Sequence, residues 1–195
     1  KSFGLMGDDV EVISILRKNL GFSELSLEKL RKFHKYLLDY NKKYNLISKN
    51  TEKKIWYRHI LDSAQIIKFL DSSKSLIISD FGSGGGFPGL IIAIYGEKFR
   101  FHVKLYEKSP VKRIFLSDMI KKLGLNNVKV ADDVYNQSEK IKSEIIVCRA
   151  FKKLGEIIKI SREIVKKPHK LIILKGKNAQ LEINNVSLAQ NYSYK

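Results

Sequence analysis

The stretch SDFGSGGGFPGL, residues 79–90, places five glycines and one proline in twelve positions. Glycine loses more backbone entropy on ordering than any other residue, so this concentration needs a compensating contact. The apolar run at residues 75–78 predicts a buried strand before it. A glycine-rich turn after a strand lets the main chain approach a ligand closely. Pro88 can then begin a helix whose N-terminus favours negative charge.

Strand-like and helical patterns alternate from this stretch to residue 174. The strand-like runs are residues 76–78, 103–106, 128–130, 145–147 and 171–174, and the helical patterns are 88–97, 110–123 and 152–167, with a weaker one at 132–143. Regular alternation predicts an α/β fold with a mostly parallel sheet and helices on both faces. The tail predicts one more strand near Tyr192–Tyr194, with the last strand of the sheet missing.

The first 70 residues have a helical pattern throughout. One short helix is expected at residues 8–20, a second is expected to begin at a Ser26 cap, and a third to span 52–70. The sequence therefore predicts a helical cap over residues 1–70 and a sheet domain over 71–195 that form one compact unit.

Charge indicates a polyanionic partner. Lysine and arginine total 37 against 20 aspartates and glutamates, giving a net charge of +17. A field of this sign attracts nucleic acids and speeds their encounter. No apolar run reaches the roughly 18 residues of a membrane span, and no signal pattern precedes the first helix, so we expect a cytoplasmic protein with no membrane contact. The single Cys148 excludes an internal disulfide and argues against a thiolate metal site.

The glycine spacing leaves two ligand classes open. The frame Gly82-Ser-Gly84-Gly-Gly86 follows an acid directly, as in S-adenosylmethionine enzymes, whereas the shifted frame from Gly84 to Gly89 matches the dinucleotide pattern G-x-G-x-x-G. A loop with a purely structural role is the third reading. Glu107 favours a nucleoside, because a carboxylate at the end of the second strand can accept both ribose hydroxyls, each bond contributing roughly 1.5–3 kcal/mol.

Five blocks resemble one family. They are YNKKYNLIS (40–48), RHILDS (58–63), DFGSGGGFPG (80–89), EKSPVKRIFL (107–116) and CRAFKKL (148–154), followed by LKG (174–176). In order and spacing they resemble the bacterial methyltransferase G family of small-subunit ribosomal RNA, also called glucose-inhibited division protein B. The resemblance implies a helical N-terminal cap on a Rossmann-like class I methyltransferase domain. It also implies transfer of a methyl group from S-adenosylmethionine to N7 of one guanine in 16S rRNA, as naked RNA or in the small ribosomal subunit.

The family's cofactor residues carry over position by position. The resemblance implies that the cofactor site comprises Asp80, Gly82, Gly84, Gly86, Phe87, Glu107, Val134, Tyr135 and Arg149. After the third strand the chain departs from the family pattern, because Tyr135 replaces a glutamate and Asp133 replaces an arginine. Tyr135 could stack on the adenine, whereas any side-chain role of the glutamate is in doubt.

No residue stands out as an obligatory catalyst. Guanine N7 has a free lone pair and no proton to remove, so the reaction needs mainly alignment of the reactants. Arg149 and His59 are the candidates for a catalytic role; for His59, which matches the family motif H-x-x-D-S with Asp62, an orienting or structural role is favoured. Without a third suitable ligand we expect no metal. For Cys148 a core position is favoured over a nucleophile.

Basic residues flank the predicted site, and we expect a monomer that binds RNA through them. The candidate phosphate contacts are Lys53, Lys54, Arg58, Lys108, Lys112, Arg113, Lys152, Lys153 and Lys177. Their RNA affinity should fall steeply with salt. Two alternatives remain open: an RNA-binding protein that has lost the cofactor, and a nicotinamide-dependent oxidoreductase that uses the shifted glycine frame.

Overall fold

A five-stranded parallel sheet forms the centre of the molecule. The computed structural model describes residues 7–166 and 168–186. In it the strands are β1 (Leu76–Phe81), β2 (Phe101–Tyr106), β3 (Val128–Ala131), β4 (Ile145–Arg149) and β5 (Lys170–Leu174). Their spatial order is β3-β2-β1-β4-β5, with every pair parallel. The five strands predicted between residues 76 and 174, and their parallel direction, are confirmed.

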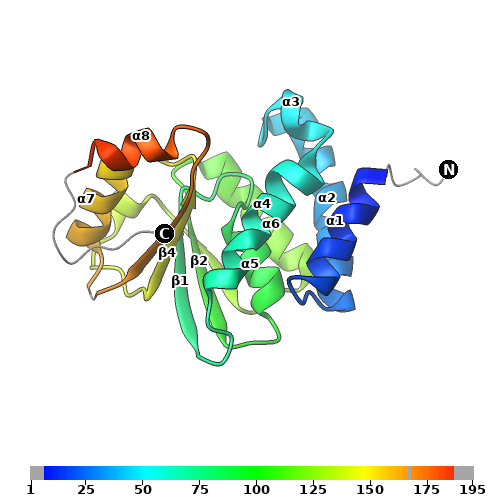
Figure 1. The fold of residues 1–195 in the computed structure, drawn as a ribbon, viewed down its shortest axis with the longest axis horizontal. Coiled ribbons are helices and arrows are strands. Elements are labelled where there is room, and N and C mark those ends of the chain that lie inside the picture. Colours follow the sequence, from blue (N-terminus) through cyan, green and yellow to red (C-terminus); the bar gives the residue numbers. More distant parts are fainter. Residues whose placement is uncertain (1–6, 167, 187–195) are drawn as a thin grey trace.

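Helices cover both faces of this sheet, as the alternation predicted. They are α5 (Gly89–Gly96) and α6 (Pro110–Leu123) on one face, and α7 (Leu154–Ile164) on the other, with the short α8 (Ala179–Asn184) beside α7 (Figure 1). α5 is apolar all round and every one of its residues is buried, so another layer must cover its outer side. The α/β class is confirmed.

That outer layer is the N-terminal helical segment. It consists of α1 (Gly7–Lys18), α2 (Glu24–Tyr44), α3 (Lys49–Glu52), the π-helix η1 (Trp56–Leu61), α4 (Asp62–Ala64) and the 3₁₀ helix η2 (Gln65–Phe69). In Figure 1 the blue helices α1 and α2 lie beyond α5 and α6, away from the sheet. One buried cluster runs from this segment into the sheet. Because this core is continuous across residue 70, the domain boundary expected there stays a prediction.

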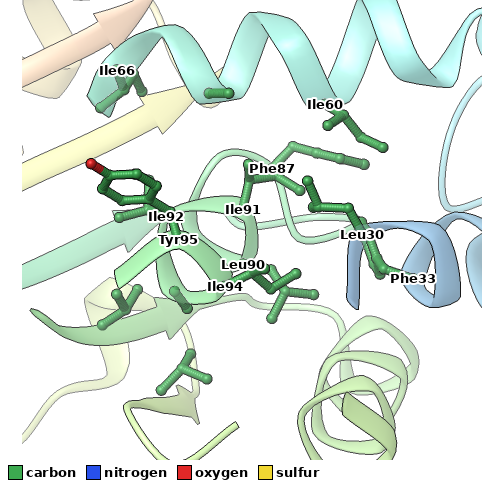
Figure 2. Packing of buried hydrophobic residues seen from close by; sticks show 14 of the residues in the cluster. Leu30, Phe33, Ile60, Ile66, Phe87, Leu90, Ile91, Ile92, Ile94 and Tyr95 are labelled. Atoms are coloured by element: carbon green, nitrogen blue, oxygen red, sulfur yellow. The ribbon is translucent and has the colours of Figure 1, made fainter. Parts of the chain in front are cut away.

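The shared core explains how the cap is held (Figure 2). Leu30 and Phe33 of α2 point toward Phe87, and their buried faces meet the apolar side chains of α5. The Phe33 and Phe87 rings lie 5.5 Å apart in a tilted arrangement. Fully burying one such side chain contributes about 1.5–3 kcal/mol, so the aromatic residue of the glycine-rich stretch stabilises the cap as well as the turn.

Three local predictions were wrong. Ser23 caps α2 by accepting a 3.1 Å hydrogen bond from the Ser26 amide, whereas Ser26 is buried and its hydroxyl donates to the Ile94 carbonyl of α5. The helix expected over 52–70 is divided into a π-helix and shorter pieces. The weak helix at 132–143 is only the 3₁₀ turn η3 (Val134–Asn136), because the Asp132 carboxylate accepts the Asp133 amide and competes with helical bonding.

Two further differences concern the C-terminal part. Helix α8 was not predicted, and the strand expected near Tyr192–Tyr194 lies outside the described residues. No helix in residues 7–166 and 168–186 combines the length and the apolar character of a membrane span.

Candidate functional site

A cavity of about 450 Å³ opens at the carboxyl ends of β1, β2 and β4. The chain runs from β1 to β2 on one side and later returns to β4 on the other, so this edge is the topological switch point where parallel α/β sheets bind ligands. Eleven predicted site residues line it: His59, Gly82, Gly84, Phe87, Glu107, Lys108, Lys112, Val134, Tyr135, Arg149 and Lys152.

The glycine-rich turn forms the floor of this cavity. The amides of Gly82 and Ser83 donate to the Tyr106 carbonyl at 2.9 and 3.0 Å, which joins the turn to the end of β2. Gly82 has φ +75°, and a Cβ there would lie 2.5 Å from the Phe151 ring. Gly84 has φ +56° and, apart from the Gly82 carbonyl at 3.9 Å, open space where a Cβ would be. Gly82 is thus required by packing, whereas Gly84 leaves room beside the cavity.

Glu107 holds this turn from the end of β2. Its Oε2 accepts a 2.8 Å hydrogen bond from the Gly84 amide, and its Oε1 accepts one of 2.8 Å from the Ser109 amide. The side chain is buried yet borders the cavity. Each carboxylate oxygen can accept a second hydrogen bond, so Glu107 can hold the turn and still bind a hydroxyl of a ligand.

Asp80 and Gly86 lie beneath the turn and do not line the cavity. Asp80 is fully buried, its Oδ2 accepts a 2.9 Å hydrogen bond from the Gly89 amide, and its Oδ1 has no partner among the described residues. Burial raises the pKa of this carboxyl to about 7. Gly86 has φ +97° and packs against Leu90. Both residues therefore shape the turn from below.

Arg149 and His59 come together although they lie 90 positions apart in the sequence. The Arg149 guanidinium donates to the Arg58 carbonyl at 2.8 Å and to Nδ1 of His59 at 2.6 Å. Both side chains lie over Phe87, with the imidazole stacked 5.0 Å and the guanidinium carbon 5.1 Å from the ring centre. This cluster joins the cap, the glycine turn and β4 in one wall of the cavity.

The His59 imidazole is neutral in this wall. Burial, and then the neighbouring Arg149 charge, lower its pKa from 6.5 to about 4. Its Nε2 lies 2.8 Å from the Thr51 hydroxyl, so both ring nitrogens are engaged within the protein. Asp62, its motif partner, has a raised pKa because of burial, an effect that the Arg149 charge opposes. The arrangement favours an orienting role for His59 over proton transfer.

The segment after β3 supplies the opposite wall. Val134 is buried, whereas Tyr135 is 54% exposed and borders the cavity with its ring. Asp133 caps this turn by accepting a 3.4 Å hydrogen bond from the Tyr135 amide. The two departures from the family pattern thus both lie at this 3₁₀ turn, and Tyr135 borders the cavity.

The predicted phosphate contacts divide into four groups. Lys108, Lys112 and Lys152 border the main cavity, and Lys54 and Arg58 border a second one of about 470 Å³ with Tyr57 and Asp62. Lys53, Lys153 and Lys177 are exposed and border neither. Arg113 is used within the fold, since its Nη1 donates to the Glu107 and Lys108 carbonyls and to Asp132.

Sequence reasoning missed several cavity residues. Leu46 and Ile47 line it from the loop after α2, and the buried Asn41 holds that loop by accepting a 2.9 Å hydrogen bond from the Ile47 amide. Ala150 has φ +50°, a left-handed conformation uncommon for a residue with a Cβ. The YNLIS block was a usable signal for the first two, whereas nothing in the sequence marks the strain at Ala150.

Cys148 is buried in the core of β4. Burial raises the pKa of its thiol to about 12, with a smaller contribution from the Asp80 charge. A thiolate nucleophile would need the opposite shift. The expectation that Cys148 is a core residue is confirmed.

Comparison with known proteins identifies the family. The model of the family "GidB: rRNA small subunit methyltransferase G" matches residues 26–194. The chain belongs to the rRNA small subunit methyltransferase G family. Proteins named ribosomal RNA small subunit methyltransferase G include one from Rickettsia felis, 39% identical over 80% of this chain and 78% of that protein. Another, from Orientia tsutsugamushi, is 32% identical over 95% of this chain and 90% of that protein.

Solved structures are more distant from this member of the methyltransferase G family. A precorrin-6y C5,15-methyltransferase from Geobacter metallireducens aligns with 72% of each chain at 14% identity and a TM-score of 0.49. The family assignment therefore rests on the sequence relatives. The family assignment confirms the resemblance that the five blocks carry. Members of this family transfer a methyl group and use S-adenosylmethionine as cofactor.

Proposed function

We propose that this chain transfers a methyl group from S-adenosylmethionine to N7 of a guanine in 16S rRNA. The observation that carries the proposal is the cavity at the switch point, where Gly84 and Glu107 face a ligand-sized space in a chain of the methyltransferase G family. The volume of about 450 Å³ is within the usual range for a cofactor site.

The residues present fit such a cofactor. The open space at Gly84 admits a ligand against the main chain, and Glu107 retains acceptor capacity for ribose hydroxyls. Tyr135 offers a ring face for the adenine, and Arg149 offers a guanidinium for the methionine carboxylate or an RNA phosphate. When bound, S-adenosylmethionine supplies a methyl group already activated by the sulfonium.

The protein's task is then to hold the acceptor in line. Guanine N7 needs no deprotonation, and alignment of the reactants can supply about 7–11 kcal/mol of the barrier reduction. Neither nitrogen of His59 is free to act as a base, because Arg149 and Thr51 engage both. His59 and Arg149 therefore act by position and charge.

RNA would approach over three lysines at the cavity mouth, of which Lys108 and Lys152 are exposed and Lys112 is half-buried. Lys108, Lys112 and Lys152 are placed to contact phosphates beside an inserted guanine, and Lys54 and Arg58 extend the basic surface along η1. Lys53, Lys153 and Lys177 are peripheral contacts, and Arg113 supports the loop that carries Lys108. The guanine must leave its stack to enter the cavity.

The proposal extends to the domains, the oligomeric state and the location of the protein. Residues 1–70 act as a cap on a methyltransferase domain at 71–195, and the protein works as a monomer in the cytoplasm on small-subunit rRNA. Size-exclusion chromatography with light scattering tests the monomer. Methylation assays with naked 16S rRNA and with assembled small subunits identify the substrate form.

The deciding experiment measures cofactor binding and methyl transfer together. Titration calorimetry with S-adenosylmethionine should give saturable binding, and mass spectrometry of treated 16S rRNA should locate one 7-methylguanosine. Glu107→Gln should weaken cofactor binding, since it loses the charge that strengthens the ribose bonds. RNA binding without cofactor binding would instead favour the non-catalytic alternative, for which the Asp133 and Tyr135 departures are the supporting observation.

A further inference from the structure

Two contacts of His59, one to Arg149 and one to Thr51, determine which ring nitrogen carries its proton. Arginine has N–H donors and no acceptor, so His59 Nδ1, 2.6 Å from the guanidinium, must present a lone pair. In a neutral imidazole the proton then resides on Nε2. That nitrogen lies 2.8 Å from the Thr51 hydroxyl and donates to it.

Thr51 is fully used by this arrangement. Its hydroxyl donates to the Ser48 carbonyl at 3.0 Å, which leaves its lone pairs for the His59 N–H and for the Ser48 hydroxyl at 2.9 Å. The series of hydrogen bonds that joins Ser48, Thr51, His59 and Arg149 thus has a defined donor at every bond. The opposite tautomer would aim an N–H of His59 at the guanidinium, and Thr51 could donate to Nε2 only by giving up its hydrogen bond to the Ser48 carbonyl.

We propose that Thr51 is a positioning residue for the cofactor site: by accepting the His59 Nε2–H it selects the imidazole tautomer that holds the Arg149 guanidinium over Phe87. This inference rests on the proposed function, in which Arg149 binds an anionic group of cofactor or RNA. Two of the five guanidinium N–H groups are used on Arg58 and His59 among the described residues, leaving three for a ligand in the cavity.

Fixing the guanidinium in advance reduces the ordering needed when a ligand binds, because arginine is otherwise a flexible side chain. The electrostatic surroundings also act on Arg149. Burial lowers the pKa of Arg149, while the charges of Asp62 and Asp80 act in the opposite direction and attract the guanidinium.

The sequence makes a direct test practical. Thr51 is the only threonine and there are four histidines, so ¹⁵N-histidine labelling gives few imidazole signals and a His59→Gln variant assigns the relevant one. The wild-type chain should show a protonated Nε2 and an unprotonated Nδ1 at pH 7. Thr51→Ser, which keeps the acceptor, should preserve this signature. Thr51→Val, which removes it, should yield a mixture of tautomers.

Function is measured on the same variants with S-adenosylmethionine as the probe. Thr51→Val should weaken cofactor binding or slow methyl transfer by up to about tenfold, the effect of removing one partly buried hydrogen bond. Thr51→Ser should keep the wild-type cofactor affinity and rate. Thermal unfolding monitors the fold, and Thr51→Ala serves if the valine variant is unstable.

Two results would overturn the inference. One is an unchanged His59 tautomer in a folded Thr51→Val or Thr51→Ala variant. The other is a changed tautomer with wild-type cofactor affinity and rate. A wild-type chain that neither binds the cofactor nor methylates RNA would instead contradict the proposed function and with it the positioning role, while the NMR comparison still decides whether Thr51 sets the tautomer.

Discussion

Glu107 and Gly84 are joined by a 2.8 Å hydrogen bond from the glycine amide to the carboxylate, across the mouth of the turn between β1 and α5. The second strand thereby holds the ligand-facing main chain of the first. Because Glu107 also accepts the Ser109 amide, one carboxylate fixes two loops at the cavity.

A methyl group added at Gly84 should impair ligand binding beyond its effect on stability. Gly84 and Gly21 both have positive φ, at +56° and +70°, and neither would meet side chains within 4 Å. Each alanine variant should lose about 1–2 kcal/mol of unfolding free energy from backbone strain. Only Gly84→Ala should also weaken S-adenosylmethionine binding in calorimetry. Equal affinities of the two variants would show that no ligand approaches Gly84.

Gly89→Ala should destabilise the fold by packing alone. The added Cβ would overlap Leu105 Cδ2 and would lie 2.5 Å from Asp80 Oδ2, closer than real Cβ atoms approach their neighbours. We expect a loss of about 1–3 kcal/mol or more in denaturant unfolding. Gly176→Ala, with nothing within 4 Å, is the control and should change stability little. A stable Gly89→Ala protein would mean that α5 can move away from β1.

Asp80 should make stability fall as pH rises from about 4 to 7. Its folded pKa is raised from 3.8 to about 7 by burial, so the folded state holds a proton that the unfolded state has released. The contribution of Asp80 to the free energy of unfolding is complete below pH 3.8 and is lost as pH rises through 7. It amounts to a few kcal/mol at most. Asp80→Asn removes this dependence. Unfolding free energies of both proteins across this range should therefore diverge, and parallel curves would contradict the buried carboxyl.

His59 should have the opposite pH dependence. Its folded pKa is lowered from 6.5 to about 4, so its contribution is complete above pH 6.5 and is lost as pH falls toward 4. The effects of Asp80 and His59 partly cancel in the wild-type protein. The single variants separate them: relative to wild type, His59→Gln should lose less stability on acidification between pH 6.5 and 4. A curve identical to wild type in this window would indicate an ordinary, solvated histidine.

RNA affinity should depend steeply on salt through the lysines at the cavity mouth. Replacing Lys108 or Lys112 by glutamine should reduce the slope of log affinity against log salt by about 1 for each phosphate that is no longer neutralised by a lysine. Lys35 on α2 is exposed but lies outside both cavities, so Lys35→Gln is the matched control. Filter-binding at several salt concentrations measures the slopes. Unchanged slopes for both mouth variants would place the RNA elsewhere.

The sequence by itself determined the order of the strands along the chain, the helices between them and the glycine turn at residues 82–89. These features depend on local periodicity and on backbone freedom, which neighbouring residues reveal. The family blocks likewise lie within short windows, which is why Gly82, Glu107 and Arg149 could be placed at one cavity in advance.

Only the tertiary structure decided which side chains meet. Thr51, His59 and Arg149 are separated by up to 98 positions, and their hydrogen bonds exist because η1 lies against the end of β4 and against Phe87 of the glycine-rich turn. The strained Ala150, the division of the 52–70 helix and the burial of Asp80 also depend on such packing. Local sequence determines which backbone conformations have low free energy. Desolvation and side-chain contacts, which set the charges of this site, arise only when distant segments pack together.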